Sequence, residues 1–457
     1  MTKPVFVRFF EELSIKDVPS VGGKNASLGE MYCQLKSKGI IVPNGFATTA
    51  EAYHYFLEST GLKKRIKEIL KDLNTKDTRN LMVHGQKVRA EIMAAKLPVD
   101  LQKEITSAYR RLSAVNKSKA LAVAIRSSAT AEDLPDASFA GQQETFLNIT
   151  GEKNLLLAVK KCIASLFTNR AISYRADKGF DHFSIALSVG VQRMVRSDLG
   201  SSGVMFTIDT ESGFRNTVLI NSIYGLGENI VQGRVNPDEF YVFKPTLAII
   251  SRSLGKKAVK MIYNPKGKSP VKNISVPLAD RQRASITDAQ VKQLAKWGME
   301  IEKHYGRAMD IEWALDGQNQ QLYIIQARPE TVQSVRNLNV LEEYRLQKKG
   351  KIVVRGQSVG NKIGTGKVNR IMDVKQIFNF KPGEVLVTDM TDPDWEPIMK
   401  IASAIVTDKG GRTCHAAIVS RELGIPCVVG TNNGSSVLNK GRSITVSCAE
   451  GEEGFVY

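Results

Sequence analysis

A histidine at the start of a predicted helix offers the sharpest chemistry in the sequence. The turn 410–414 begins with two glycines, and the helical stretch after it ends at Gly424, with Pro426 two residues further on. We expect Thr413 to be the N-cap and His415 to lie in the first helical turn. The N–H groups and dipole there favour anions and disfavour imidazolium, so a neutral ring nitrogen could attack phosphorus. A histidine that only caps or packs is the alternative that the spacing leaves open.

A predicted β-hairpin carries a second set of reactive groups. Residues 309–328 contain two strand-like runs around an Asp-Gly turn. Alternation along the first strand places Asp310 and Glu312 on one face. In the same way, Gln326 and Arg328 share one face of the second strand. Oxygen ligands beside a guanidinium suit a magnesium ion that bridges a polyphosphate, although a surface hairpin with ordinary solvated charges fits the pattern as well.

Two other segments could approach phosphates. Residues 21–27 form a Gly-Gly turn that delivers Lys24 to a helix start, and residues 124–130 form a strand that ends in Arg126 and small hydroxyl-rich positions. The small-residue loop 132–141 could close as a lid. Taken singly, each segment is equally well explained as a plain turn. The sequence contains no P-loop, no Gly-x-Gly-x-x-Gly dinucleotide motif and no Gly-x-Ser-x-Gly nucleophile motif.

The remaining histidines and the cysteines do not indicate a metal site. The five cysteines show no Cys-x-x-Cys spacing, which argues against a disulfide framework or a zinc site and favours a reducing cytoplasm. Four histidines are expected to be surface or packing residues, because none is spaced as a metal ligand from another: His54, His84, His182 and His304.

Composition places the chain among globular proteins. It has 457 residues, of which 42% are hydrophobic and 24% charged. This usage excludes a disordered or collagen-like chain and allows roughly two to four domains. No run of eighteen apolar residues occurs, and the N-terminus becomes polar too early for a signal peptide. We therefore expect a cytoplasmic protein without a membrane partner.

The formal charge of +18, from 64 Lys and Arg against 46 Asp and Glu, does not decide the function. In residues 62–73 the apolar side chains recur with helical spacing, so the lysines form the wet face of an amphipathic helix. No basic stripe interleaved with aromatic residues and no nucleic-acid module is visible. We expect no nucleic-acid partner.

The segments around these residues suggest two domains and a linker. Thr48 and Glu51 predict a capping box that opens a helix over 51–57. Polar residues from 332 to 351 predict a linker helix. From residue 356 on, glycine-punctuated short strands predict a second compact α/β domain of about one hundred residues. Strands are predicted within the runs 218–220, 240–242, 384–387 and 404–406.

Taken together, these segments resemble the phosphoenolpyruvate synthase (pyruvate, water dikinase) family, and the resemblance extends from Val21 to Tyr457. No single segment would be specific, but the combination is. The segments that carry it are 21–30, 126–133, 236–241, 326–330, 391–397 and the segment around His415.

The resemblance implies an α/β and α+β multidomain fold. An ATP-grasp nucleotide-binding domain over 1–331 would be followed by a linker over 332–355 and a swivelling phosphohistidine domain over 356–457. In this family ATP gives a pyrophosphoryl group to a histidine, water removes the outer phosphate, and the phosphohistidine then reacts with pyruvate. The products are AMP, phosphate and phosphoenolpyruvate.

Roles are carried over residue by residue. The resemblance implies that Lys24 and Arg126 bind the ATP phosphates. Glu312 and Gln326 would be the Mg²⁺ ligands, and Arg328 would stabilise the transferring charge. Asp310 is a weaker candidate beside them.

The histidine segment adds a carrier and a regulatory position. His415 resembles the phosphoryl carrier, and Arg412 and Cys414 favour the water-dependent synthase over the phosphate-dependent dikinase. Thr413 resembles the threonine that a bifunctional regulatory kinase phosphorylates in this family. A phosphate there would crowd His415 with like charge.

One departure from the family concerns the acceptor. The family continues into a pyruvate-binding (β/α)₈ barrel of about 250 residues, whereas only 42 residues follow His415. We therefore expect this chain to carry the ATP half-reaction, with pyruvate bound through a missing barrel or a second chain. A truncated or split gene, one chain of a two-chain enzyme and a fragment all fit. A nucleotide-binding remnant, or a phosphotransferase acting on another acceptor, are the alternatives.

Overall fold

The computed structural model describes residues 4–457 apart from 76, 131–132, 135–136, 139–144, 266 and 332–341. The chain divides into two compact units. The first comprises residues 1–196, 263–272 and 323–328, and the second comprises residues 197–262, 273–322 and 329–457.

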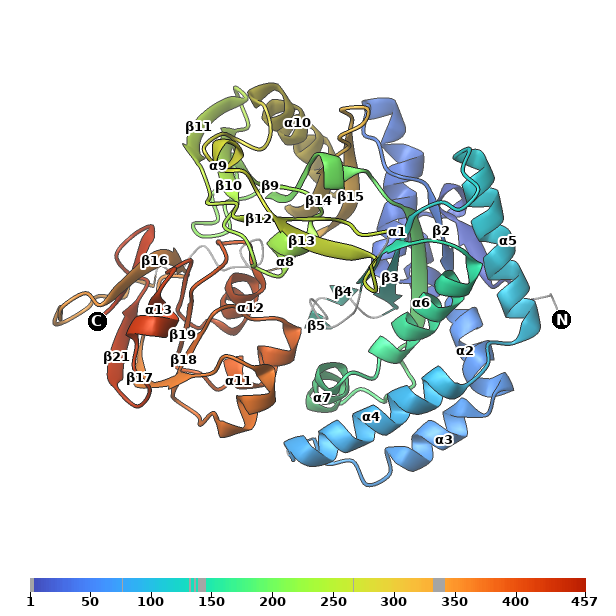
Figure 1. Cartoon of the computed structure of the whole chain (residues 1–457), viewed down its shortest axis with the longest axis horizontal. Coiled ribbons are helices and arrows are strands. Elements are labelled where there is room, and N and C mark those ends of the chain that lie inside the picture. Colours follow the sequence, from blue (N-terminus) through green and yellow to red (C-terminus); the bar gives the residue numbers. More distant parts are fainter. Residues whose placement is uncertain are drawn as a thin grey trace. The chain divides into compact units, whose positions relative to one another are not determined.

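The first unit is built on an antiparallel five-stranded sheet (Figure 1). In spatial order its strands are β1 (Val7–Phe9), β2 (Gly45–Thr48), β7 (Leu187–Arg193), β3 (Val123–Ala129) and β6 (Thr145–Ile149). Its helices are α1 (Val18–Gln34), α2 (Ala50–Ser59), α3 (Leu62–Ile69), α4 (Thr78–Ala94), α5 (Val99–Val115), α6 (Glu152–Ser165) and α7 (Asn169–Asp177). Apolar side chains of the helices and strands form one continuous core.

Local structure in this unit confirms one prediction and corrects another. The amphipathic helix predicted over 62–73 forms as α3, which ends at Ile69, four residues earlier than predicted, with its apolar residues Leu62 and Ile66 buried. The predicted capping box at Thr48 is wrong: Thr49 is the N-cap of α2, and its Oγ1 accepts a hydrogen bond from the Ala52 amide at 3.1 Å. Thr48 instead ends β2, where its Oγ1 accepts from the Val189 amide at 2.9 Å. The contact of Thr48 with strand β7 therefore moves the N-cap from Thr48 to Thr49.

The second unit supplies strands β11, β10, β9, β8 and β14 of a six-stranded sheet with the order β11-β10-β9-β8-β14-β15, whereas residues 323–328 of β15 count with the first unit. Helix α10 (Asp288–Tyr305) lies against one face of it (Figure 1). The sheet confirms the strands predicted at 218–220 and 240–242, and β14 and β15 are neighbours, as the predicted hairpin requires. The strands are β8 (Ser201–Phe206), β9 (Thr217–Tyr224), β10 (Asp238–Phe243), β11 (Ala248–Ser253), β14 (Met309–Leu315) and β15 (Leu322–Pro329); smaller elements are α8 (Glu228–Val231), β12 (Val259–Tyr263), β13 (Val271–Ser275) and α9 (Leu278–Arg281).

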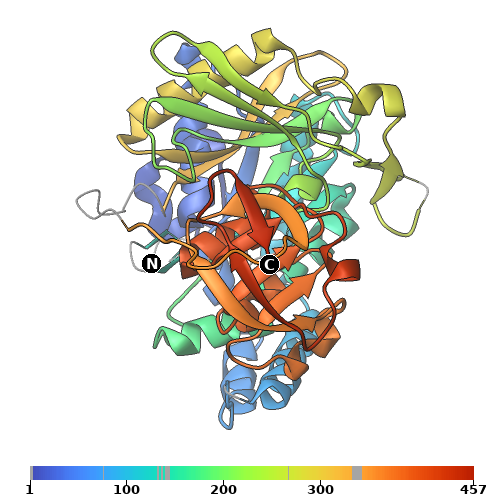
Figure 2. The same ribbon diagram turned by 90° about the vertical axis from the view of Figure 1, so that its left-hand side faces the viewer.

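The C-terminal part of the second unit is a closed barrel, whose orange and red strands are seen in Figure 2. Strands β18, β19 and β20 run parallel, and α12 connects β19 to β20. Two apolar clusters within residues 353–456 fill it. The barrel order is β16 (Val354–Val359), β20 (Cys427–Val429), β19 (Ala404–Thr407), β18 (Val385–Thr388), β17 (Ile363–Arg370), β21 (Ser443–Ser447) and β22 (Glu453–Val456); its helices are α11 (Glu396–Met399), α12 (His415–Leu423) and α13 (Gly434–Val437).

The predicted linker helix is not found where it can be tested. Residues 332–341 lie outside the described part of the chain, and residues 342–353 contain no helix. Arg345 pairs with Glu343, two positions away, at 3.0 Å. Side chains two apart do not face each other on a helix, so this ion pair is consistent with an extended backbone in the segment. The domain boundaries at 331 and 356 stay a prediction.

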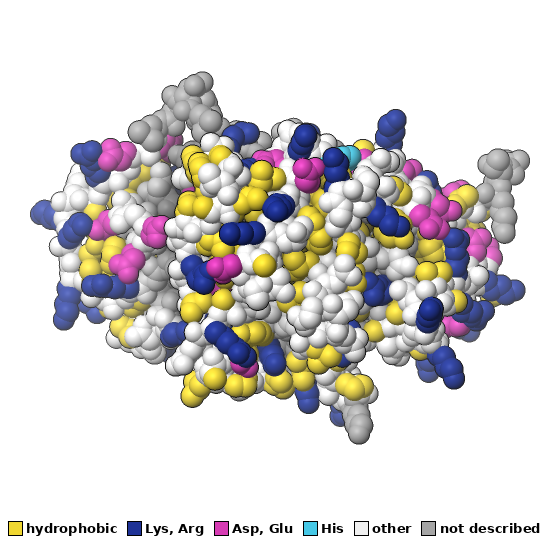
Figure 3. Space-filling view, turned by 90° about the horizontal axis from the view of Figure 1, so that it is seen from above, with side chains coloured by type: hydrophobic (Ala, Val, Ile, Leu, Met, Phe, Trp, Pro, Cys, Tyr) yellow, Lys and Arg dark blue, Asp and Glu magenta, His cyan; other side chains and the backbone are white. Residues whose placement is uncertain are grey.

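The surface charge is dispersed over the face shown in Figure 3, where Lys and Arg side chains alternate with polar and apolar ones. On that face the excess of basic residues does not gather into one patch. Among the described residues, no helix combines the length and the apolar character that a membrane crossing needs.

Candidate active site

The Gly-Gly turn at the start of α1 breaks the helix as predicted. Gly22 has φ 73° and ψ 164°, so the regular helix begins only after it, next to Lys24. A Cβ on Gly22 would lie 2.3 Å from Ser128 Oγ and 2.6 Å from the Ser128 carbonyl oxygen. Glycine is therefore required by conformation and by space. The turn places a fresh helix N-terminus and Lys24 beside strand β3, which also carries Arg126.

Buried hydrogen bonds fix this helix start. Asn25, which is 2% exposed, donates through Nδ2 to the Val21 carbonyl at 3.2 Å and to Ser188 Oγ at 2.8 Å. One turn after Lys24, Ser27 Oγ donates to the Ala327 carbonyl of β15 at 2.8 Å. Lys24 is thus mounted on a helix that cannot rotate without breaking buried polar contacts.

Arg126 on β3 reaches the backbone of β15 next to Gln326. The Arg126 guanidinium donates through Nη1 to the Ile325 carbonyl at 3.4 Å. Ser27 binds the Ala327 carbonyl, so the two contacts flank Gln326, whose side chain is 7% exposed. Within the first unit the structure therefore gathers Lys24, Arg126 and Gln326. Arg328 lies two residues after Gln326 on β15, so its half-buried side chain is on the same face of the strand.

Strand register in the second unit places the predicted acidic ligands on a defined face. Glu312 pairs with Val204 of β8, and Val204 pairs with Asn221 of β9. Asn221 in turn pairs with Glu239 of β10. Paired residues of an antiparallel sheet point to the same face, so these side chains form one row across four strands.

Asp310 belongs to a second row on this same face. It pairs with Phe206, then Leu219 and then Tyr241. The buried Val204, Phe206 and Leu219 pack on this face. Asp310 and Glu312 are both half-buried, which suits groups that a ligand must reach.

The donor set fits magnesium. Among the described residues, no cluster of three His, Cys, Asp or Glu side chains could hold a metal alone. Mg²⁺ needs no such cluster, because it commonly binds one or two protein oxygens together with substrate phosphates and water. Glu312 on β14 and Gln326 on β15 each carry oxygen donors of this kind.

The parallel strands of the barrel bring His415 next to a threonine that the sequence analysis did not select. Thr391 follows the carboxyl end of β18, and His415 follows that of β19. The carboxyl ends of adjacent parallel strands meet at one edge. There Thr391 Oγ1 lies 2.9 Å from Nδ1 of His415, and the contact is buried. The available signal was the Thr-Asp-Pro sequence that begins at Thr391, shortly after the strand predicted over 384–387.

The start of α12 differs from the prediction by one residue. Cys414 is the N-cap, with φ −76° and ψ 166°, and His415 is the first helical residue. Thr413 is therefore part of the turn and not the cap. The predicted helix end is confirmed, because Gly424 is the left-handed C-cap with φ 65°. His415 is 7% exposed and lies where the amide groups of α12 favour an anion.

The turn before His415 packs on the segment that leads into β10. The Gly410 amide donates to Asn236 Oδ1 at 3.1 Å, and Gly410 has φ 101°. Arg412, 5% exposed, donates to the Glu452 carbonyl at 2.9 Å and lies 3.5 Å from the Tyr241 hydroxyl. The turn is held by both the barrel and the sheet.

Thr413 and the nearby thiols are enclosed. Thr413 is 2% exposed, and its Oγ1 has no hydrogen-bond partner among the described residues. Burial raises the pKa of Cys414, and it raises that of Cys448 to about 12. These thiols are protonated packing residues at neutral pH.

The structure thus forms two groups from the predicted site residues. Lys24, Arg126, Gln326 and Arg328 lie in the first unit, whereas Glu312, Thr413 and His415 lie in the second. The predicted lid over 132–141 falls mostly outside the described residues; within it, β4 (Asp133–Leu134) pairs with β5 (Ala137–Ser138).

Comparison with protein families gives two matches. The model for the pyruvate phosphate dikinase AMP/ATP-binding domain matches residues 18–348. The model for the mobile domain of PEP-utilising enzymes matches residues 380–451. This order, together with the sheets and the barrel, confirms the predicted multidomain fold class.

Curated relatives are similar along nearly the whole chain. A phosphoenolpyruvate synthase of Pseudomonas aeruginosa (strain UCBPP-PA14) is 57% identical over 459 residues, which cover 99% of this chain and 58% of the relative. Phosphoenolpyruvate synthases of Escherichia coli (strain K12) and Aquifex aeolicus (strain VF5) are 54% and 53% identical, each over 99% of this chain. The chain spans 57% and 54% of their respective lengths.

Proposed function

Because the chain belongs to the family of the pyruvate phosphate dikinase AMP/ATP-binding domain, we propose that it is a phosphotransferase that moves phosphate from ATP to His415. The chain would carry the ATP-dependent half of a reaction of phosphoenolpyruvate synthase type. The observation that carries the proposal is the buried contact between Thr391 Oγ1 and His415 Nδ1 at the start of α12.

We infer from this contact that Nε2 is the reacting nitrogen. A threonine hydroxyl can accept a hydrogen bond from Nδ1–H, and that tautomer leaves the ring lone pair on Nε2. Nε2 would attack the β-phosphorus of ATP, while the bond from that phosphorus to the α–β bridging oxygen breaks and AMP leaves. The pyrophosphoryl group then sits on His415, and water removes its outer phosphate.

The proposal also assigns roles toward the nucleotide to the other predicted site residues. Lys24 and Arg126 would bind the ATP phosphates, and Arg328 would stabilise the charge that develops on the transferring group. Glu312 and Gln326 would hold Mg²⁺, which when bound neutralises phosphate charge. The support for these roles is the convergence of α1, β3 and β15 around Gln326.

The acceptor belongs to the proposal for the whole protein. The relatives are named phosphoenolpyruvate synthases, and this chain spans little more than half of each. We propose pyruvate as acceptor, bound by a (β/α)₈ barrel or by a second chain, neither of which is among the described residues.

Thr413 is proposed as a site of regulatory phosphorylation. Its hydroxyl is enclosed in the structure, so a kinase could reach it only after the turn 410–414 opens. A phosphate on Thr413 would repel an incoming nucleotide phosphate at the neighbouring His415.

The test is transfer of label from ATP labelled at the β-phosphate to the purified chain. We expect acid-labile label on the parent and none on His415→Ala. The exposed His304 on α10 provides the control, because His304→Ala removes a histidine remote from the barrel. Label that survives His415→Ala would show that the carrier assignment is wrong, and ATP binding without AMP formation would favour a nucleotide-binding remnant.

A further inference from the structure

The carboxylate of Glu211, next to the six-stranded sheet, binds two separate places in the barrel. Glu211 lies in the turn between β8 and β9. Its Oε1 accepts from Nε of Arg421 at 3.0 Å and also from Nη2 of the same guanidinium. Its Oε2 accepts from the Gly360 amide at 2.9 Å, just beyond the end of β16. Both carboxylate oxygens therefore accept hydrogen bonds from residues of the barrel domain.

This ion pair is shielded and preorganised. The Arg421 side chain is 5% exposed and that of Glu211 is 19% exposed. Asp209 accepts from the Ser212 amide at 3.0 Å, and the Gly213 amide donates to the Asp209 carbonyl at 2.9 Å, so the turn that presents Glu211 is internally braced. Two N–H groups of the Arg421 guanidinium donate to the same carboxylate oxygen, so the contact constrains the orientation of the guanidinium as well as its distance.

The helix that carries His415 is therefore tied at both ends. Arg421 lies in the last turn of α12 and binds Glu211. Just before the first turn, Gly410 binds Asn236 and Arg412 reaches Tyr241. All three anchors (Glu211, Asn236 and Tyr241) belong to the sheet or its connecting segments.

The anchored face is the one that carries the predicted magnesium ligand. Tyr241 lies in the same row as Asp310, three strands along the sheet. At about 4.8 Å per strand this separation is roughly 14 Å. The contacts of Gly410, Arg412 and Arg421 thus hold the turn before His415 and the end of α12 on the sheet that also carries Asp310 and Glu312.

We propose that Glu211 is a positioning residue that keeps the His415 helix docked for loading from ATP, and this inference rests on the proposed function. Its carboxylate does not touch the reacting atoms but fixes α12 through Arg421 and β16 through Gly360. Loss of the pair leaves Arg421 without its counter-charge and lets the barrel leave the sheet. The docked population falls, and loading slows in proportion.

A charge exchange tests the pair. In single-turnover labelling with β-labelled ATP, we expect Glu211→Arg and Arg421→Glu each to slow the labelling of His415 by about tenfold. The double variant restores the pairing and should regain most of the parental rate. Glu211→Gln, which keeps the shape and removes the charge, gives a milder loss if Glu211→Arg does not fold. ATP affinity should not change, because Lys24 and Arg126 are untouched.

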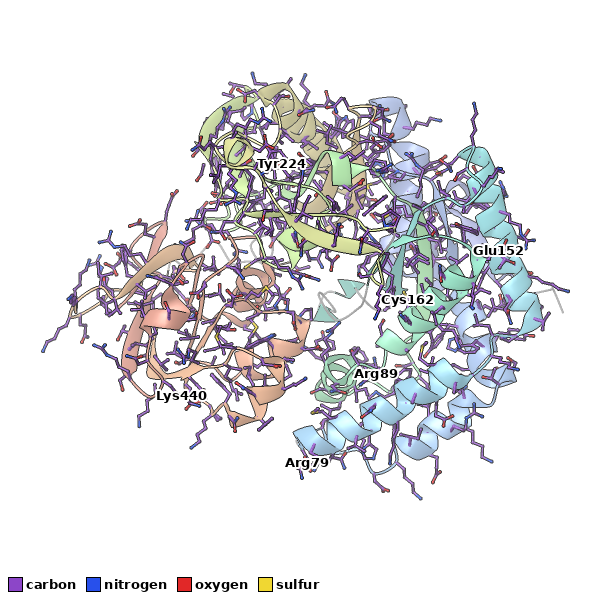
Figure 4. All side chains as sticks on the ribbon, viewed as in Figure 1. Arg79, Arg89, Glu152, Cys162, Tyr224 and Lys440 are labelled. Carbon is purple, nitrogen blue, oxygen red and sulfur yellow. The ribbon has the colours of Figure 1, made fainter. Side chains whose placement is uncertain are left out.

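A second readout is independent of phosphoryl transfer. Cys33 is the exposed cysteine and the other four are buried, so Cys33→Ser provides a background for spin labels at Lys292→Cys on α10 and at Lys440→Cys on the barrel. Both lysines are exposed, and Lys440 is labelled in Figure 4. Pulsed dipolar spectroscopy should give one narrow distance distribution for the parent, a broad one for Glu211→Arg and a narrow one again for the exchanged pair.

The two readouts separate the two hypotheses. If the parent shows no label on His415, the proposed function is wrong, yet the spin-label distances still test the docking role. If Glu211→Arg keeps the parental distance distribution, or if the exchanged pair labels no faster than the slower single variant, Glu211 does not position α12.

Discussion

At the scale of single residues, Thr391 shows how a neutral side chain can set the chemistry of its neighbour. Its Oγ1 is 2.9 Å from His415 Nδ1. Removal of the hydroxyl frees the ring to rotate and to exchange tautomers. We expect Thr391→Val to slow the labelling of His415 by roughly 10- to 100-fold. Nitrogen-15 spectra of the His415 ring should show a mixture of tautomers in place of one.

The conservative variant separates the hydroxyl from the packing. Thr391→Ser keeps the oxygen and loses a methyl group, so it should label nearly as fast as the parent. Equal slowing by serine and valine would mean that shape, and not the hydrogen bond, is what His415 needs from this position.

His182 provides a prediction about stability and pH. Burial, helped by the nearby Arg175, lowers its pKa from 6.5 to about 4, and Nδ1 accepts from Arg175 Nε at 3.1 Å. The unfolded chain therefore binds more protons than the folded one between these two values. The stabilisation is complete above pH 6.5 and is lost as the pH falls toward 4.

The expected size is about 1–2 kcal/mol, reduced from the full linkage value because the ring is partly exposed to solvent. Urea unfolding of the parent and of His182→Gln at pH 7 and pH 5 measures this contribution. It is the loss of unfolding free energy from pH 7 to pH 5 in the parent minus the same loss in the variant. The variant should lose less stability over this interval. Parallel losses in the two proteins would show that His182 does not contribute to the acid sensitivity.

At the scale of elements, two glycines that share φ but differ in ψ, which is 164° at Gly22 and 9° at Gly39, predict different outcomes. Gly22 has φ 73° and Gly39 has φ 74°, but a Cβ on Gly22 meets Ser128 at 2.3 Å whereas a Cβ on Gly39 has nothing within 4 Å. Gly39→Ala should cost about 1 kcal/mol from the left-handed backbone alone. Gly22→Ala adds a clash with β3 that must move the start of α1, so it should cost more than about 2 kcal/mol.

Nucleotide titration gives the functional half of this comparison. We expect Gly39→Ala to bind ATP as the parent does and Gly22→Ala to bind it at least tenfold more weakly, because Lys24 is displaced. Equal ATP affinity in the two variants would show that Lys24 does not bind the ATP phosphates.

The elements also show how far sequence patterns reach. Alternation predicted the hairpin of β14 and β15, and glycine spacing predicted both the break before Lys24 and the end of α12. Each of these signals is local. The cap of α2 was wrong because Thr48 pairs with Val189, a partner 141 residues away. The contact of Thr391 with His415 was missed for the same reason, since it depends on which strands lie side by side.

At the scale of the whole molecule, the sequence predicted the fold class but not how the barrel is held. The ties from Glu211 and Asn236 to the barrel join residues 210 and 174 positions apart. Such pairings leave no periodic trace along the chain. One compact unit accordingly contains residues 197–262 together with the barrel.

Residues 349–457 expressed alone decide whether the barrel is a domain in its own right. We expect this fragment to fold, because both apolar clusters of the barrel lie within it and its sheet closes without a free edge. Arg412 and Arg421 lose Tyr241 and Glu211 but become hydrated, so no charge stays buried without a partner. A single calorimetric transition of about 60–80 kcal/mol is typical of a domain of this size. A broad, non-cooperative transition would instead show that the sheet of β8 to β11 belongs to the same folding unit as the barrel. In that case the barrel could swivel away from the sheet only by breaking native structure each time.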